Sequence, residues 1–298
     1  MNFAEIGYLK EDEKLWVKKY ILKLPKAIKE KYFFCFVPLK IEKIKLADEI
    51  GYKITLPITK SEENMRLKER MIKKAVAFFM DKKVEIIINN DYIPIPAMFL
   101  QARGSLLLSY FSYEEIKKYC VNKEIELGKL KIVVKDGGNL ETFVVLNRLF
   151  GEINHLSVCT DAKMEFTSFY NSIYEETGLV TEIFSNPKSA YMKEADVIIN
   201  CSSDMENYEY IFKKGALYIE CAPIKGKLKR IMERRKDLSF VYETSLKMGE
   251  EELKSSQLEA LIFIKCKDIK KTVTEFRIEK SDIETAKFLE AAGFVLKG

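Results

Sequence analysis

Short runs of β-branched and aromatic residues alternate with helical stretches along the chain from about residue 125 onward. The runs are KIVVK (131–135), HLSVCT (155–160), LVTEIF (179–184), DVIINCS (196–202), ALYIEC (216–221) and LSFVYE (238–243). Between the first two, LETFVVLNRLFGEI brings its apolar side chains to one helical face, at Phe143, Leu146, Leu149 and Phe150. Strands that alternate with helices predict a parallel sheet with helices on both faces.

Six such runs match the strand count of a Rossmann fold, so we predict an α/β, doubly wound parallel-sheet domain over residues 126–250. The first 125 residues are less regular. They contain strand-like runs at 32–39, 52–58 and 84–90 and helical stretches at 62–83 and 105–120. Two further helical stretches are predicted, at 250–268 and at 281–298, with Ser281 as the N-cap and Gly293 as the stop of the second. We therefore predict a smaller N-terminal α/β domain over 1–125, completed by C-terminal helices from 251–298.

The charge pattern and the cysteine pattern exclude several classes of protein. Fifty Lys and Arg residues against 45 Asp and Glu residues give a formal charge of +5. The charges are interleaved, and the basic run at 225–236 is predicted to be a solvated helix face, so no nucleic-acid partner is expected. The six cysteines have no C-x-x-C spacing and His155 is the single histidine, so neither a disulfide framework nor a metal site is expected. No segment has the length of ~18 apolar residues that a membrane helix needs. We expect a cytoplasmic protein without a membrane span.

The segment KDGGNLE follows the first strand of the predicted Rossmann unit. A dinucleotide turn uses three spaced glycines because its backbone bends tightly and approaches a pyrophosphate, which the helix N-terminus binds. Only Gly137 and Gly138 are present here, so this glycine loop is degenerate. Asp136 or Asn139 is expected to cap the following helix, with Glu141 in its first turn. The carboxylates of Asp136 and Glu141 would repel a pyrophosphate.

Asp161 favours a cofactor. It lies 24 residues after Gly137, at the end of the second predicted strand. This is close to the ~20-residue offset at which an acidic side chain holds the ribose hydroxyls. A solvated loop aspartate explains it equally well. NAD or NADP, bound near Gly137, Gly138, Asn139 and Asp161, is therefore one hypothesis.

Three segments carry a family resemblance. Residues 51–92 contain a glycine, an apolar strand, a Pro-x-Thr turn and a long helix, in that order. EADVIINCSSD (194–204) is similar to a strand that ends beside a nicotinamide, and residues 279–298 are similar to a C-terminal helix ending in Gly-Phe-x-Leu-x-Gly. Together they resemble the shikimate/quinate dehydrogenase-like and amino-acid-dehydrogenase-like two-domain Rossmann family, which includes fatty-aldehyde-forming acyl-carrier-protein reductases. The resemblance implies NAD(P)-dependent hydride transfer in an interdomain cleft, with the run Cys201, Ser202 and Ser203 beside the cofactor.

The resemblance also implies a catalytic pair in the first domain. In the shikimate-type pattern, a lysine after the first-domain strand and an aspartate from a later strand end move a proton while hydride is transferred. ITLPITK offers Lys60 and INND offers Asp91. A lysine and a carboxylate in a water-poor cleft tune each other's pKa for such roles. The alternative is that Lys60 is a surface lysine leading into a helix and Asp91 a turn residue.

The same family pattern assigns residues to the substrate cleft. Thr59 and Asn90 flank the catalytic pair, and Gly104 and Ser105 belong to ARGSLLLS, where the family has a Thr-Gly-Asn-Ser type segment. Cys221 ends the fifth predicted strand. It or Cys201 could form a thioester with an acyl substrate, or both could be small buried apolar residues.

Two hypotheses on function follow. One is an NAD(P)-dependent oxidoreductase-like protein acting on a small carbonyl, hydroxy-acid or acyl substrate. The other is a non-catalytic Rossmann-fold binding or regulatory protein that has lost dinucleotide binding. A small-molecule substrate is the expected partner of the first, and a homodimer is compatible with both.

Overall fold

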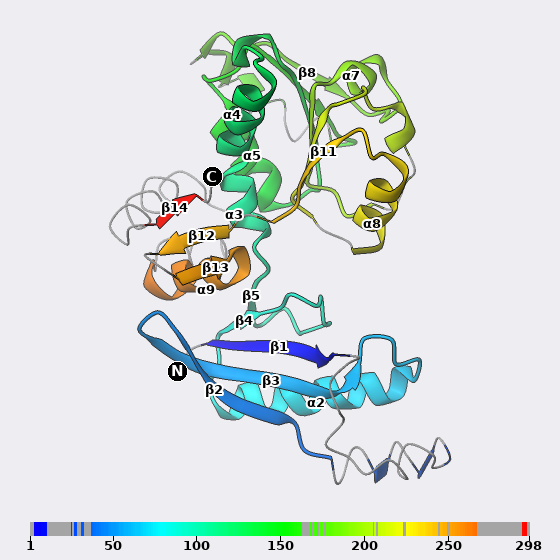
Figure 1. The fold of residues 1–298 in the computed structure, drawn as a ribbon, viewed down its shortest axis with the longest axis vertical. Helices are drawn as coiled ribbons and strands as arrows, with labels where there is room; N and C mark the ends of the chain where they lie inside the picture. Colours follow the sequence, from blue (N-terminus) through cyan, green and yellow to red (C-terminus); the bar gives the residue numbers. More distant parts are fainter. Residues whose placement is uncertain are drawn as a thin grey trace. The chain divides into compact units, whose positions relative to one another are not determined.

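The computed structural model describes residues 3–10, 25, 27–28, 31–32, 37–162, 167, 170–171, 173–175, 177–204, 206, 208–222, 225–243, 245–248, 251–266 and 294–296 (Figure 1). The chain forms two compact units. The first unit contains the described residues up to Arg103 and those from Ser256 to Cys266. The second contains those from Gly104 to Ser255 and from Phe294 to Leu296. The assignment of a substrate role to 1–125 with 251–298, and of a nucleotide role to 126–250, stays a prediction.

A five-stranded sheet forms the centre of the first unit. Its order is β2-β3-β1-β4-β5, and the strands are β1 (Phe3–Leu9), β2 (Lys40–Leu46), β3 (Glu49–Thr59), β4 (Ile86–Ile88) and β5 (Leu100–Ala102). The β2–β3 pair is antiparallel, and the other three pairs are parallel. The predicted strand at 52–58 lies within β3 and that at 84–90 contains β4. The predicted strand at 32–39 falls partly outside the described residues, and its last three residues form no strand.

Helix α2 (Met65–Asp81) packs its apolar stripe against this sheet (Figure 1). The Asn64 side chain caps it by accepting a hydrogen bond from the Leu67 N–H at 3.2 Å, which satisfies one of the amides that a helix start leaves open. Met71, Ala75 and Phe79 are buried as the periodicity predicts, whereas Met65 is exposed. A single long amphipathic helix therefore supplies much of the first core.

The segment predicted as a helix at 250–268 contains both a strand and a helix. Residues Glu251–Lys254 form β13, which pairs antiparallel with β12 (Ser245–Met248), and β12 also pairs with β14 (Phe294–Leu296). Helix α9 then runs over Ser255–Lys265. The helical prediction was wrong for the first residues because ladder pairing with β12 outweighs the helix propensity of Glu, Leu and Lys. The helix predicted from Ser281 to Gly293 lies outside the described residues.

A six-stranded parallel sheet forms the centre of the second unit. The strands are β6 (Lys131–Lys135), β7 (His155–Cys159), β8 (Thr181–Phe184), β9 (Val197–Asn200), β10 (Leu217–Glu220) and β11 (Ser239–Val241). Their spatial order is β11-β10-β9-β6-β7-β8, and every neighbouring pair is parallel. Read from β8, this is the order 3-2-1-4-5-6 of a Rossmann fold. The fold class predicted from the six apolar runs is confirmed.

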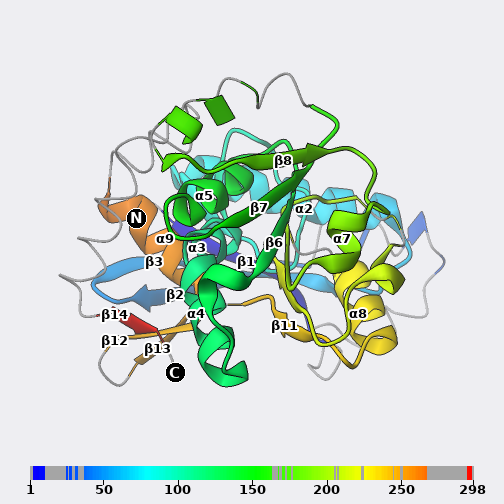
Figure 2. The same ribbon diagram turned by 90° about the horizontal axis from the view of Figure 1, so that it is seen from above.

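Helices cover both faces of this sheet. On one face, α3 (Ser105–Tyr110), α4 (Ser112–Lys123) and α5 (Leu140–Leu149) enclose the larger core. On the other face, α7 (Ala190–Glu194) and α8 (Lys225–Arg234) enclose a second core (Figure 2). The stretch predicted as one helix at 105–120 is divided at Phe111 into α3 and α4. Within the described part of the chain, no helix is both long and apolar enough to cross a membrane.

Candidate functional site

The glycine turn lies between β6 and α5, where a Rossmann fold binds its cofactor. Asn139 is the N-cap of α5, and its side-chain oxygen accepts a hydrogen bond from the Thr142 N–H at 3.2 Å. Its side-chain amide donates to the Cys201 carbonyl at the end of β9, at 2.8 Å. Of the two caps that the sequence left open, Asn139 is the one observed. The same side chain starts the helix and ties it to the adjacent strand end.

The two glycines of the turn have different physical roles. A Cβ atom on Gly137 would lie 2.0 Å from the Cys201 carbonyl oxygen, far inside van der Waals contact. Gly138 has a φ of +61°, and a Cβ there would meet open space. Gly137 is therefore required by the close approach of strand β9, and Gly138 by the left-handed backbone. Neither role requires a bound ligand.

The polar groups of the turn bind one another. The Gly138 N–H donates to Asp136 Oδ1 at 2.8 Å, and the Gly137 N–H donates to Thr142 Oγ1 at 3.1 Å. The other carboxylate oxygen of Asp136 accepts a hydrogen bond from the Thr160 hydroxyl at 2.8 Å. A dinucleotide turn directs such donors to the pyrophosphate. Here the Asp136 carboxylate accepts hydrogen bonds that the phosphate oxygens would otherwise accept.

The other predicted cofactor residues lie at the same edge of the sheet. Asp161 is exposed just beyond β7, and Ser203 is exposed just beyond β9. Ser202 is buried and lies 3.0 Å, hydroxyl to carboxylate, from Asp204. The strand ends thus bring Asp161, Ser202 and Ser203 to the edge that contains the glycine turn.

Cys201 and Cys221 are fully buried in the core that α4 and α5 cover. They follow the last residues of the paired strands β9 and β10. A hydrogen bond with the Cys221 thiol, together with burial, raises the pKa of Cys201 well above its usual range. A nucleophilic cysteine needs a thiolate, and this environment favours the neutral thiol.

Lys60 and Asp91, the predicted catalytic pair, lie close together in the first unit. Lys60 Nζ is 3.6 Å from Asp91 Oδ1 and donates to the Asp91 carbonyl at 3.3 Å. The other carboxylate oxygen accepts the Tyr8 N–H at 3.2 Å, and burial together with Asp91 raises the pKa of the Tyr8 hydroxyl. The neighbours Thr59 and Asn90 are partly buried. The geometry allows proton exchange between the two groups, although half of the Lys60 side chain is exposed.

Gly104 and Ser105 begin helix α3 of the second unit. Gly104 is its N-cap with a φ of +84°, and the Ser105 hydroxyl donates to Glu141 Oε1 at 2.8 Å. Glu141 is in the first turn of α5, so this bond joins two helix starts. The predicted cleft residues therefore divide between the units, with Thr59 and Asn90 in the first and the others in the second.

Sequence reasoning missed a row of polar side chains across the carboxyl ends of three strands. Lys135 ends β6, Asn200 ends β9 and Glu220 ends β10; Asn200 is in register with both of the others. The preceding strand residues are apolar or aromatic, and the three polar side chains share the face that α8 covers. The sequence did contain a signal for this row. Each of the three apolar runs ends in a polar residue, and the alternation of side chains along a strand can place all three on one face of the sheet.

Two carboxylates bind the other polar groups of this row: Glu220, which belongs to the row, and Asp204, which follows β9. Glu220 is fully buried and accepts hydrogen bonds from the Asn200 side-chain amide and, at 2.9 Å, from the Tyr218 hydroxyl. Burial raises its pKa to about 6, against the opposing effects of nearby Lys227 and of these hydrogen bonds. Asp204 lies 2.9 Å from Lys135 Nζ. Burial opposes its ionisation, but the hydrogen bond from Lys135 and the nearby ammonium groups lower its pKa.

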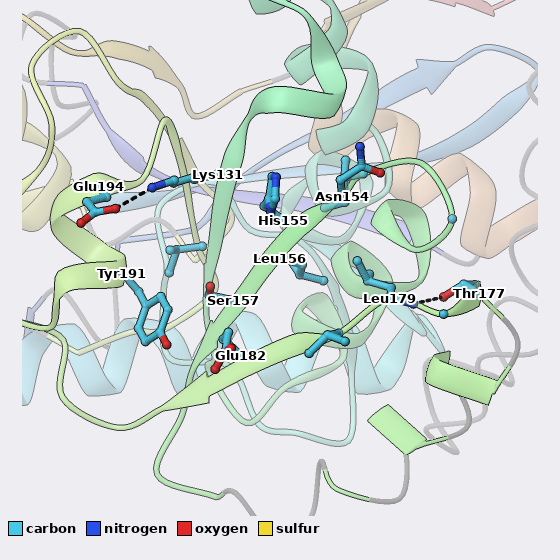
Figure 3. A pocket seen from close by; sticks show the side chains of 15 residues that line it. Lys131, Asn154, His155, Leu156, Ser157, Thr177, Leu179, Glu182, Tyr191 and Glu194 are labelled. Carbon is cyan, nitrogen blue, oxygen red and sulfur yellow. Dashed lines mark hydrogen bonds and ion pairs between the residues drawn. The ribbon is translucent and has the colours of Figure 1, made fainter.

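A hollow of about 580 Å³ lies on the same face of the sheet at β6, β7 and β8 (Figure 3). It is lined by His155, Ser157, Glu182 and Tyr191, among others. Helix α7, which has five residues, contributes Tyr191 and Glu194 to its lining. The Glu182 carboxylate raises the pKa of the Tyr191 hydroxyl. The hollow is lined by groups from the amino ends and middles of these strands, away from the edge that contains the glycine turn.

The comparisons with known proteins are remote. No protein-family model and no curated protein matches the chain. L-tryptophan dehydrogenase from Nostoc punctiforme is similar at 13% identity, over 81% of this chain and 70% of that chain, with a TM-score of 0.37. Shikimate 5-dehydrogenase from Listeria monocytogenes, in complex with shikimate and NAD, is similar at 8% identity over 63% and 75% of the two chains, with a TM-score of 0.34.

The iminosuccinate reductase of Paracoccus denitrificans, in complex with NAD+, is similar at 15% identity with a TM-score of 0.29. The match covers 39% of this chain and 35% of that one, so the chain spans about a third of its length. All these TM-scores are below 0.5. The fold assignment therefore rests on the strand order of the six-stranded sheet.

Proposed function

We propose that this chain is a Rossmann-fold binding or regulatory protein that takes a small ligand at the carboxyl edge of its six-stranded sheet, without holding a dinucleotide pyrophosphate on its glycine turn. The observation that carries the proposal is the position of Asp136. Its carboxylate accepts the Gly138 N–H and the Thr160 hydroxyl, each at 2.8 Å. Open α/β sheets bind ligands at this edge. The fold therefore keeps its usual binding region, whereas the donors at the glycine turn are already hydrogen-bonded to the Asp136 carboxylate.

The electrostatic effect of Asp136 on a pyrophosphate is large. Two like charges ~4 Å apart interact by about 4 kcal/mol at an effective dielectric constant of about 20. That energy corresponds to about a thousandfold in Kd. Glu141 in the first turn of α5 adds a second negative charge. A micromolar dinucleotide site would thereby become a millimolar one.

Calorimetric titration with NAD, NADH, NADP and NADPH tests this proposal. The wild-type chain should bind none of the four at micromolar affinity. Asp136→Asn keeps the shape of the side chain and removes its charge, so any residual dinucleotide affinity should increase in this variant. Glu233→Gln removes a carboxylate that is 66% exposed on α8, outside the glycine turn, and is the matched control. Micromolar binding of any of the four by the wild type would overturn the proposal.

The second candidate is an NAD(P)-dependent oxidoreductase acting on a small carbonyl, hydroxy-acid or acyl substrate, with NAD or NADP as its cofactor. The approach of Lys60 Nζ to within 3.6 Å of Asp91 Oδ1 favours it, because a lysine and a carboxylate in contact can act as acid and base. This candidate requires a dinucleotide to bind, with Asp161 on the ribose. Lys60→Met and Asp91→Asn should then lower kcat and leave cofactor affinity unchanged. A cytoplasmic location and a homodimer are compatible with both candidates.

A further inference from the structure

Lys227, in the first turn of α8, carries a buried ammonium group. Its side chain is 1% exposed, and its Nζ has no hydrogen-bond partner among the residues that the structure describes. The Asp204 carboxylate lies 3.7 Å away, outside hydrogen-bonding distance. The ring of Tyr208 is 5.9 Å from the same nitrogen. Burying a cation with three open donors is costly unless acceptor oxygens surround it, so this nitrogen needs a partner that the described side chains do not provide.

The neighbouring carboxylates are engaged elsewhere. Asp204 Oδ2 is 2.9 Å from Lys135 Nζ and 3.0 Å from the Ser202 hydroxyl. Glu220 accepts hydrogen bonds from Asn200, Tyr218 and the Ala222 N–H. Asp204 thus lies between two ammonium groups. Glu220 also attracts Lys227 electrostatically. Its oxygens are held by other donors, however, and the Lys227 N–H groups have no acceptor among the described residues.

A second buried polar atom in the same network is also unsatisfied. Asn200 donates through its side-chain amide to Glu220 and to the Ser202 carbonyl, whereas its Oδ1 has no hydrogen-bond partner among the described residues. Buried polar atoms without partners are rare in folded proteins and call for an unseen water, ion or ligand. Two of them occur here in one network, at the edge of the sheet where this fold binds ligands.

The members of the cluster differ in their exposure to solvent. The side chains of Lys135 and Asp204 are 13% and 28% exposed, whereas Lys227 is at 1%. Lys135 and Asp204 therefore form the open side of the cluster, and Lys227 lies at its closed side. Both lysines face the ring of Tyr208, at 5.2 Å and 5.9 Å from its centroid.

The geometry points to a binding site for a small oxyanion, a carboxylate or phosphate group, held by Lys227 and Lys135 at the carboxyl ends of β6, β9 and β10. Such a group offers several acceptor oxygens to the Lys227 ammonium, whose N–H groups have no acceptor among the described residues, and it places negative charge between the two lysines. This inference deepens the proposed binding function and rests on it. It names the chemical class of the ligand and the residues that select it. Burial lowers the pKa of Lys227, and a bound anion would favour its charged form.

Anion-dependent stability of the full chain tests the site. Melting temperatures are measured at pH 7 and constant ionic strength in chloride alone, with added inorganic phosphate, and with added acetate. A ligand that binds only the folded state raises the melting temperature by mass action. We expect one of the two oxyanions to raise it by at least about 2 °C at fifty times its Kd. The two arms distinguish a phosphate-bearing from a carboxylate-bearing ligand, and calorimetry then gives the Kd of the effective anion.

Three variants identify the residues involved. Lys227→Met should weaken the oxyanion at least about tenfold, because it removes a charge-assisted hydrogen-bond donor. Lys229→Met is the matched control, since Lys229 is on the same helix with its side chain 76% exposed, and it should keep the wild-type Kd. Asp204→Asn keeps the shape of the competing acceptor and removes its charge, so it should tighten the oxyanion severalfold. A purely structural ion-pair cluster predicts no such gain.

A failure of the oxyanion site can be distinguished from a failure of the proposed function. Absence of any oxyanion-specific stabilisation in the wild type would leave water as the partner of Lys227 and overturn the inference. A Kd for the oxyanion that is unchanged in Lys227→Met, or one that increases in Asp204→Asn, would also overturn the inference. If Lys227→Met does not fold, the Asp204→Asn variant decides alone. These results leave the dinucleotide titrations untouched. Conversely, micromolar dinucleotide binding on the glycine turn would overturn the proposed function, whatever the anion response.

Discussion

Replacing Glu220 by glutamine should make the chain's stability less dependent on pH. Glu220 is fully buried, and its pKa is raised to about 6 from a usual value of 4.5. The folded state therefore holds this proton more tightly than the unfolded state does. Stability that depends on the protonated group is fully present below about pH 4.5 and is lost as the pH rises through about 6.

The size of the effect follows from the shift. A displacement of about 1.5 pKa units corresponds to about 2 kcal/mol at 1.36 kcal/mol per unit. Glutamine preserves the shape and can still accept the Asn200 amide hydrogen bond, but it does not ionise. The free energy of unfolding of the wild type, relative to Glu220→Gln, should therefore fall by about 1.5 to 2 kcal/mol between pH 4.5 and pH 7.

Urea unfolding followed by far-ultraviolet circular dichroism, at several values between pH 4.5 and pH 7, measures this difference. Glu233→Gln is the matched control, because Glu233 is on the exposed side of α8 with 66% of its side chain accessible. Its difference from the wild type should stay flat within a few tenths of a kcal/mol. A flat difference for Glu220→Gln, or one that grows in favour of the wild type as the pH rises, would refute the reasoning that burial dominates at this carboxyl group.

Three further predictions concern the turn and the adjacent strand ends. Gly137→Ala should lower the free energy of unfolding by more than about 3 kcal/mol, because its Cβ would meet the Cys201 carbonyl. Gly138→Ala should lower it by only about 1 kcal/mol, because of the positive φ at that position. Equal losses for the two variants in urea unfolding would contradict the assigned roles. Asn139→Ala should cost about 1 to 2 kcal/mol through loss of the cap, and a melting temperature equal to that of the wild type would contradict this. The thiols of Cys201 and Cys221 should react with an aromatic disulfide reagent only after unfolding, because both are fully buried; rapid labelling of either one in the native chain, located by peptide mass, would disprove it.

The sheet of the second unit could be predicted because its central strands β6, β9 and β10 are buried on both faces. Runs such as KIVVK and DVIINCS are rich in β-branched residues, which is typical of buried parallel strands. Strand β1 (Phe3–Leu9) was not predicted. Its sequence FAEIGYL contains a glutamate and a glycine, and it becomes a central strand only through its pairing with β3 and β4. Tertiary pairing of that kind leaves little local signal.

The candidate site was predictable only in part. The glycine turn belongs to a local motif. The pair Lys60 and Asp91 followed from the family resemblance, and its catalytic role stays a prediction. The cluster around Lys227 combines residues from β6, from the segment after β9, and from β10 and α8. A lysine in a basic helix was expected to be solvated, and the structure instead buries Lys227. Only the register of the three strands shows that their polar ends meet.

The close packing of Gly137 against the Cys201 carbonyl distinguishes two selective pressures that can both conserve a glycine in such a turn. One is contact with a cofactor, and the other is the packing of the backbone. A sequence drifting after the loss of its cofactor would be free to exchange residues that touched only the ligand. Position 137 would not be free, since any side chain there collides with the backbone of β9. The glycine would therefore persist in descendants that bind nothing at this turn. A glycine at this position therefore indicates how a strand end packs against the turn, and it is no evidence of cofactor binding.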